Sequence, residues 1–104
     1  MGQDEFDAAM LERYELWRDQ IGYRATRYLQ MVRRRGGVES AHLLLAKKGV
    51  SQGFLAIAEA RRLDLTVEWL VLQARYAALF SSQELDIARE RLTRYGASAA
   101  SLPS

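Results

Sequence analysis

Apolar residues recur every three or four positions along most of the chain, which is the spacing of one face of an α-helix. No segment alternates apolar and polar residues for long enough to predict a half-buried strand. Gly22 follows the first apolar stripe directly and is typical of a residue that ends a helix. The pattern therefore predicts an all-α fold. The members of the first stripe are Phe6, Met10, Tyr14, Trp17 and Ile21.

Glycines and helix-capping residues divide the rest of the chain into further short helices. Ser51 and Thr66 are each placed to cap a helix, and Ser81 with Glu84 forms a capping box. These signals predict a single compact domain of five or six short helices over residues 1–96. The small polar residues 97–104 are expected to form a disordered tail. The expected helices after the first cover residues 24–35, 38–47, 52–62, 66–76 and 82–95.

The helical spacing also predicts which side chains form the core. The segment 66–76 is apolar on nearly all sides, because Trp69 and Leu72 lie off the face that carries Val67 and Leu70. Such a helix is either central in the core or part of an interface. The residues expected in the core are Leu29, Val32, Leu44, Leu55, Val67, Leu70, Leu85 and Leu92.

The composition suits one globular domain, with 104 residues of which 49% are apolar and 27% are charged. The chain has no cysteine, which excludes disulfides and thiolate metal sites and fits a reducing cytoplasm. No apolar run approaches the roughly 18 residues of a membrane span. The first ten residues are acidic, whereas a signal peptide begins with basic residues. We therefore expect a cytoplasmic protein that has no membrane partner.

The net charge of +2 is distributed unevenly along the chain. Residues 1–20 carry a charge of −4, residues 21–48 carry +6, and the remainder is neutral. The basic block either forms a patch on the surface or is neutralised by the acidic first helix. Five cations of this block, here called the basic flank, are the candidate nucleic-acid-binding residues: Arg24, Arg27, Arg34, Lys47 and Lys48.

Arginines along one flank of a helix suit contacts with phosphate groups, which position a nucleic acid without reading its sequence. The alternative is a solvated helix face, because basic residues near helix C-termini are favoured by the helix dipole. That alternative accounts for Arg34, Lys47 and Lys48, which lie near helix ends. It does not account for Arg24 and Arg27, which lie near a helix start.

The stretch AHLLLAKKGVSQGFLAIAEA resembles a helix-turn-helix, with Gly49 in the turn and Leu55 where the second helix packs on the first. Leu45 stands where a small residue would let the two helices approach closely, and the second helix is mostly apolar. Two ordinary core helices joined by a glycine turn are therefore the favoured interpretation.

The segments GGVESAHLLLA, GVSQGF, RLDLTVE and ELDIARERL resemble a family of small all-helical bacterial proteins. The resemblance covers about residues 23–92. It implies a bacterial origin and an intact single domain, and it implies no activity, substrate or catalytic residue.

Enzymatic chemistry finds little support in the sequence. The spacing of Arg35 and His42 resembles the arginine–histidine signature of HEPN-type RNases, but a glycine pair interrupts it and the chain contains no asparagine. His42 is the only histidine, so neither a metal site nor a catalytic triad with an oriented acid is evident. No glycine-rich nucleotide-binding loop occurs. We therefore predict a protein that is not an enzyme and needs no cofactor or metal.

The sequence leads to three hypotheses about function. The first is a non-catalytic binding module whose basic flank, within residues 24–48, contacts nucleic-acid phosphates without strong sequence specificity. The second is an adaptor domain that binds another protein or forms a homodimer through an apolar surface of Trp69, Leu72 and Tyr76. The third and most distant is an RNase that uses Arg35 and His42.

Overall fold

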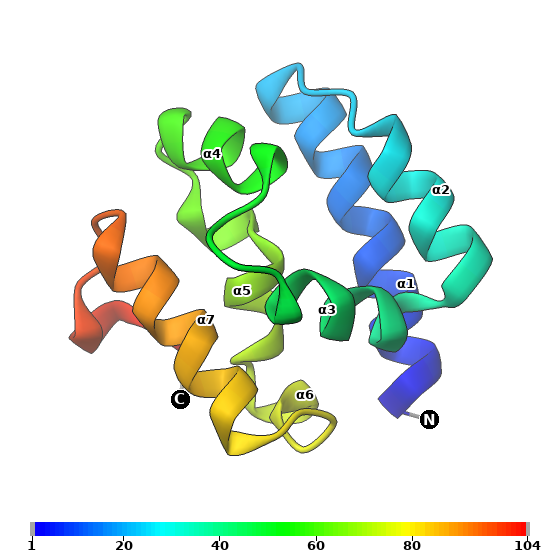
Figure 1. Cartoon of the computed structure of the whole chain (residues 1–104). Coiled ribbons are helices and arrows are strands. Elements are labelled where there is room, and N and C mark those ends of the chain that lie inside the picture. The colour runs from blue at the N-terminus through cyan, green and yellow to red at the C-terminus, as the bar shows by residue number, and fades with distance from the viewer. Residues whose placement is uncertain (1, 104) are drawn as a thin grey trace.

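The computed structural model describes residues 2–103, and this part of the chain consists of helices and turns without a strand. The predicted all-α single domain is therefore confirmed. Helices α1 and α2 run side by side, and α5 lies between them and α7 (Figure 1). The α-helices of this range are α1 (Gly2–Leu16), α2 (Thr26–Arg35), α3 (Gly37–Ala46), α4 (Gln52–Glu59), α5 (Val67–Val71), α6 (Ala74–Ala77) and α7 (Ser82–Arg94).

Several helix boundaries form where the sequence predicts them. The Ser51 hydroxyl accepts a hydrogen bond of 3.0 Å from the Phe54 backbone N–H at the start of α4. Ser81 and Glu84 form the predicted capping box at the start of α7, with bonds of 3.1 Å and 2.9 Å. Gly22 adopts a left-handed conformation with a φ of 76°. These local signals act within a few residues of the helix end, so they do not depend on the rest of the fold.

The last turn of the first helix is wider than an α-helical turn. After Leu16 the chain continues as a π-helix, η1 (Trp17–Ile21). The Trp17 side chain is buried, and its indole N–H donates a hydrogen bond of 2.9 Å to the Leu65 carbonyl. Leu65 belongs to a short 3₁₀ turn, η2 (Leu63–Leu65). The bond therefore ties the end of the first helix to the chain just before α5.

The prediction of a single helix over residues 66–76 is wrong. Thr66 caps α5 as expected, but α5 ends at Val71, and α6 begins at Ala74 in a new direction. Both sides of this segment consequently face other helices, which explains why its sequence is apolar all round.

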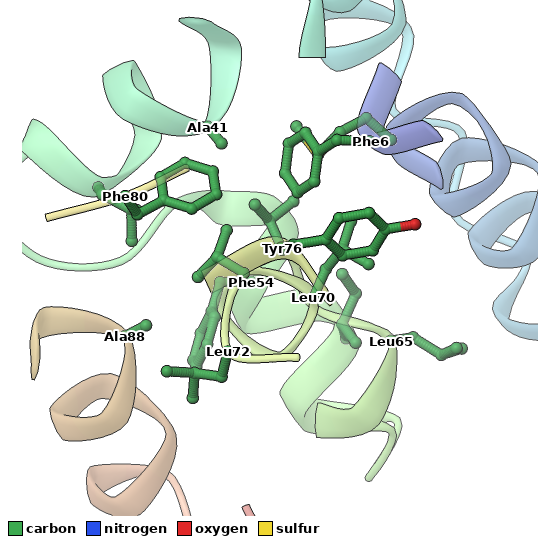
Figure 2. Packing of buried hydrophobic residues seen from close by; sticks show 14 of the residues in the cluster. Phe6, Ala41, Phe54, Leu65, Leu70, Leu72, Tyr76, Phe80 and Ala88 are labelled. Atoms are coloured by element: carbon green, nitrogen blue, oxygen red, sulfur yellow. The ribbon is translucent and has the colours of Figure 1, made fainter. Parts of the chain in front are cut away.

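The predicted contact surface is lost for the same reason. Leu72 is 2% exposed and Tyr76 is 5% exposed, and Figure 2 shows both among the buried side chains. Trp69 is half-buried and packs against the core. The surface of Trp69, Leu72 and Tyr76 proposed for a protein partner is therefore corrected: it is largely internal to the folded chain.

The predicted core is partly confirmed. Val32, Val67, Leu70 and Leu92 are buried, whereas Leu29, Leu44 and Leu85 are half-buried. Leu55 is 39% exposed, because α4 turns Phe54 and Ile57 inward instead. The side chain expected to seal a helix-turn-helix thus points away from the core, and the chief neighbour of α4 is η2 rather than α3.

Within residues 97–103 the C-terminal segment is ordered, whereas a disordered tail is expected over 97–104; residue 104 lies outside the described residues. Residues 99–101 form a 3₁₀ turn, η3 (Ala99–Ser101), capped by the Ser98 hydroxyl. Ala97 and Leu102 pack against the core. The segment gains this order from two apolar contacts that its small polar composition hides.

Candidate functional site

A cavity of about 490 Å³ opens between the start of α2, the end of α3 and the starts of α4 and α5. Its interior is apolar, because Trp17, Phe54 and Val67 line it and each is at most 5% exposed. Its mouth is basic, because the exposed residues Arg24 and Arg27 also line it. This space, which we call the cavity, thus combines an apolar interior with a cationic entrance.

Lys47, which follows the last residue of α3, lines the cavity together with Arg24 and Arg27. Lys47 is 20 residues from Arg27 in the sequence, and the fold brings it to the same opening. Within residues 2–103, none of the three forms an ion pair. Their charges are therefore available to an anionic ligand.

The other two members of the basic flank lie outside the cavity. Arg34 is exposed on α2, seven residues after Arg27, so the two share one side of the helix and are separated by about 10 Å along its axis. Lys48 is exposed and, with Lys47, lines a second and more polar depression beside α7. Like the others, Arg34 and Lys48 have no ion-pair partner in the described range. The basic flank thus extends beyond the cavity, along α2 to Arg34 and past the end of α3 to Lys48.

The acidic first helix does not neutralise the basic flank. Asp19 pairs with its neighbour Arg18 at 2.8 Å. Across residues 2–103, neither Glu12 nor Glu15 forms an ion pair with an arginine of α2. Among residues 2–103, Glu68 is the one carboxylate that lines the cavity, and it is already engaged by a buried arginine.

That arginine is Arg91 of α7, whose Nη1 lies 3.0 Å from Glu68 Oε2 while both side chains are 6% exposed. Arg91 also donates to the carbonyl oxygens of Leu44, Leu45 and Lys47 at 3.1, 3.3 and 2.6 Å. The last carbonyls of a helix have no partner within the helix. Arg91 therefore caps the end of α3 and fixes the backbone of Lys47 at the cavity mouth.

Burial raises the pKa of the Glu68 carboxyl, while its own backbone N–H and Arg91 lower it in part. Removing a carboxylate from water is costly, and the hydrogen-bonded guanidinium offsets much of that cost. The pair is thus a structural support that joins α5 to α7 behind the cavity, and it leaves the cations at the mouth uncompensated.

Aromatic rings form the inner wall of the cavity. The Trp17 and Tyr28 rings meet edge to face with centroids 4.6 Å apart. The Tyr28 hydroxyl donates to the Met10 carbonyl at 2.9 Å, and burial raises the pKa of this phenol. Tyr23 is half-buried, lines the cavity and lies beside Gly53 at the start of α4. Trp17 and Tyr28 are therefore held by hydrogen bonds, and the Tyr23 ring is less buried than the Trp17 ring.

The sequence pattern identified the cations of this site and missed its rings. Trp17 and Tyr28 occupy stripe positions, where an aromatic residue is expected to fill the core. Glu68 and Arg91 carry one signal that could have been used: each is a charged residue directly beside apolar stripe residues. Such residues, when buried, require a partner of opposite charge.

Arg35 and His42, the residues of the RNase hypothesis, have separate partners. Arg35 lies 3.3 Å from Glu39 at the exposed end of α2. His42 Nδ1 lies 2.6 Å from Glu84 Oε2, and its ring packs beside Phe80 with centroids 5.1 Å apart. No group of three or more potential metal ligands occurs among residues 2–103. These contacts give His42 a structural role between α3 and α7.

We expect His42→Gln to lower the free energy of unfolding by less than about 1 kcal/mol, because the contact between His42 and Glu84 is partly exposed. Chemical denaturation of the two proteins checks the stability. Incubation of wild type with labelled RNA tests for RNA cleavage. Cleavage by wild type that His42→Gln abolishes without unfolding would contradict the structural role.

A comparison with known protein families, curated proteins and solved structures finds no match to this chain. The resemblance to small bacterial helical proteins consequently stays a prediction. None of the helices within residues 2–103 has the length and apolar character that crossing a membrane requires.

Proposed function

We propose that the protein binds nucleic acid through its phosphates, using the basic flank, without strong sequence preference. The observation that carries this proposal is the convergence of Arg24, Arg27 and Lys47, exposed and without ion-pair partners, at the mouth of the cavity. Three like charges at one opening repel one another, so an anion that lies among them relieves the repulsion.

The kind of cation supports phosphate as the anion. A guanidinium is planar and always charged, and it binds phosphate through two parallel hydrogen bonds. The charges continue to Arg34 on α2 and to Lys48 beyond α3, which suits a ligand that carries several phosphates in a row. Contacts to phosphate groups position a nucleic acid without reading its sequence. We therefore expect random and defined sequences to bind alike.

Binding should depend steeply on salt, because each neutralised phosphate releases counterions. Three to five contacts imply a slope of about −3 to −5 for log affinity against log salt on a duplex, and a slightly shallower slope on a single strand. The double variant Arg27→Glu/Arg34→Glu should weaken binding to every sequence and flatten this slope. Fluorescence anisotropy with labelled oligonucleotides at several salt concentrations measures both effects.

The matched control is Arg33→Glu/Arg75→Glu, which changes the net charge equally at two exposed arginines outside the flank. It should retain most of the affinity. Circular dichroism should show equal helical content in all three proteins. The proposal fails if wild type does not bind at low salt, or if the control weakens binding as strongly as the flank variant.

The folded chain does not present the apolar surface that the adaptor hypothesis needs. This hypothesis requires Leu72 and Tyr76 at the surface, and both are buried in the folded chain.

A further inference from the structure

We infer that the cavity receives an unpaired nucleobase, so that the protein prefers single-stranded nucleic acid to a duplex. This inference rests on the proposed function, because Arg24, Arg27 and Lys47 would hold the phosphates on either side of that base. A nucleotide is a planar ring joined to a phosphate, and the cavity offers an apolar, partly aromatic interior directly behind cations.

The size of the cavity suits this ligand. Its volume of about 490 Å³ lies within the range of roughly 300–1,000 Å³ that is typical of small-molecule pockets. A duplex cannot enter such a space, and a base in a duplex must first be unpaired and unstacked. A base in a single strand is already unpaired. The cavity therefore favours a single strand over a duplex.

The cavity wall supplies the surface on which a base can pack. Tyr23 is half-buried beside Trp17, with ring centroids 6.4 Å apart, and both residues line the cavity. Stacking of one base on an aromatic side chain strengthens single-strand binding by about 10-fold to 100-fold. Because every base has an aromatic face, this contact adds affinity with little sequence preference.

The polar groups of the cavity fit a tolerant base site. Thr26 and Gln52 line it and are exposed, so they can form hydrogen bonds with a base edge. The Glu68 carboxylate is held by Arg91 and does not repel the phosphates as a free charge would. An acidic peptide would satisfy the cations but would leave the aromatic interior empty, which is why we favour a nucleotide.

The decisive comparison uses wild-type protein and three labelled ligands of equal length: a base-bearing single strand, an abasic single strand and a duplex. Affinities are measured by fluorescence anisotropy at one low salt concentration. The base-bearing strand should bind at least about 10-fold more tightly than the abasic strand, which keeps the phosphates and loses the rings. The duplex should also bind more weakly than the base-bearing strand.

The outcomes separate this inference from the proposed function. Equal affinity for base-bearing and abasic strands overturns the base site, although phosphate binding stands. Tighter binding of the duplex than of the base-bearing strand also overturns it. Failure of every ligand to bind at low salt overturns the proposed function itself, and the base site with it.

A variant of Tyr23 tests whether the preference for the base-bearing strand arises in the cavity. Tyr23→Leu keeps an apolar side chain but removes the accessible ring, so it should reduce the preference for the base-bearing strand and leave the affinity for the abasic strand unchanged. The matched control is Tyr14→Leu, a half-buried tyrosine of α1 outside the cavity lining, which should keep the preference. A full preference in folded Tyr23→Leu would contradict the cavity as the base site. If this variant does not fold, the wild-type comparison with the abasic strand still decides.

Discussion

Replacement of Arg91 with methionine is expected to destabilise the protein by about 3–5 kcal/mol, because it leaves Glu68 buried without its partner. The same change removes the hydrogen bonds from Arg91 to three carbonyl oxygens at the end of α3. Those carbonyls then lack a partner, and a buried unsatisfied group is costly. Chemical denaturation of both proteins measures the difference.

The double variant Glu68→Leu/Arg91→Met separates the ion pair from the packing. It removes both charges and should recover much of the loss, because well-packed apolar residues often replace a buried ion pair at little cost. A double variant as unstable as Arg91→Met alone would contradict a major cost from the unpaired Glu68 carboxylate. It would assign the loss to the carbonyls of α3.

The pH dependence gives an independent check. Burial raises the pKa of Glu68 in the folded protein, and loss of Arg91 removes a contact that lowers it. A carboxyl with a raised pKa destabilises the fold once the pH rises above its unfolded pKa of about 4.3. Below that pH the carboxyl is protonated in both states and the penalty vanishes. The gap in stability between Arg91→Met and wild type should therefore narrow as the pH falls toward 4.

Features of the fold that depend on neighbouring residues could be predicted from the sequence. Gly22, Ser51 and the pair Ser81–Glu84 each end or begin a helix through bonds within a few residues. The break between α5 and α6 could not be predicted, because no glycine or proline marks it. It depends on tertiary packing, in which the Tyr76 ring meets the Phe6 ring with centroids 5.2 Å apart.

The candidate site likewise has features that the sequence predicts and features that depend on tertiary packing. Arg24 and Arg27 were recognised because a helix start does not favour basic residues. Their meeting with Lys47 at one opening requires the packing of α2 against α3, together with the Arg91 contacts that fix the end of α3. A helical stripe predicts that Trp17 and Tyr28 face inward, but it does not predict that a cavity lies in front of their rings. The aromatic wall therefore could not be predicted from the sequence.

Gly37 of α3 lies in close contact with α1. Its backbone N–H donates a hydrogen bond of 2.6 Å to Asp7 Oδ1, so a carboxylate from α1 caps the first turn of α3. A Cβ at position 37 would lie 2.7 Å from that oxygen and 2.9 Å from the Asp7 Cα. Because the second atom belongs to the backbone, a side-chain rotation alone does not relieve the contact.

We therefore expect Gly37→Ala to destabilise the protein by about 3 kcal/mol, at the upper end of the usual cost of overpacking. Alanine has a higher helix propensity than glycine, by at most about 1 kcal/mol in a helix interior, so propensity alone would not make Gly37→Ala destabilising. The matched control is Gly53→Ala in α4, where a Cβ would meet its nearest neighbour at an ordinary 3.5 Å, so that variant should be neutral or more stable. Thermal and chemical denaturation of the two variants show directly whether each change stabilises or destabilises the protein.

Equal stability of both variants would show that α1 and α3 move apart at little cost. Destabilisation of Gly37→Ala alone would locate the constraint in the contact with Asp7, which holds α3, and with it Lys47, in place relative to α1.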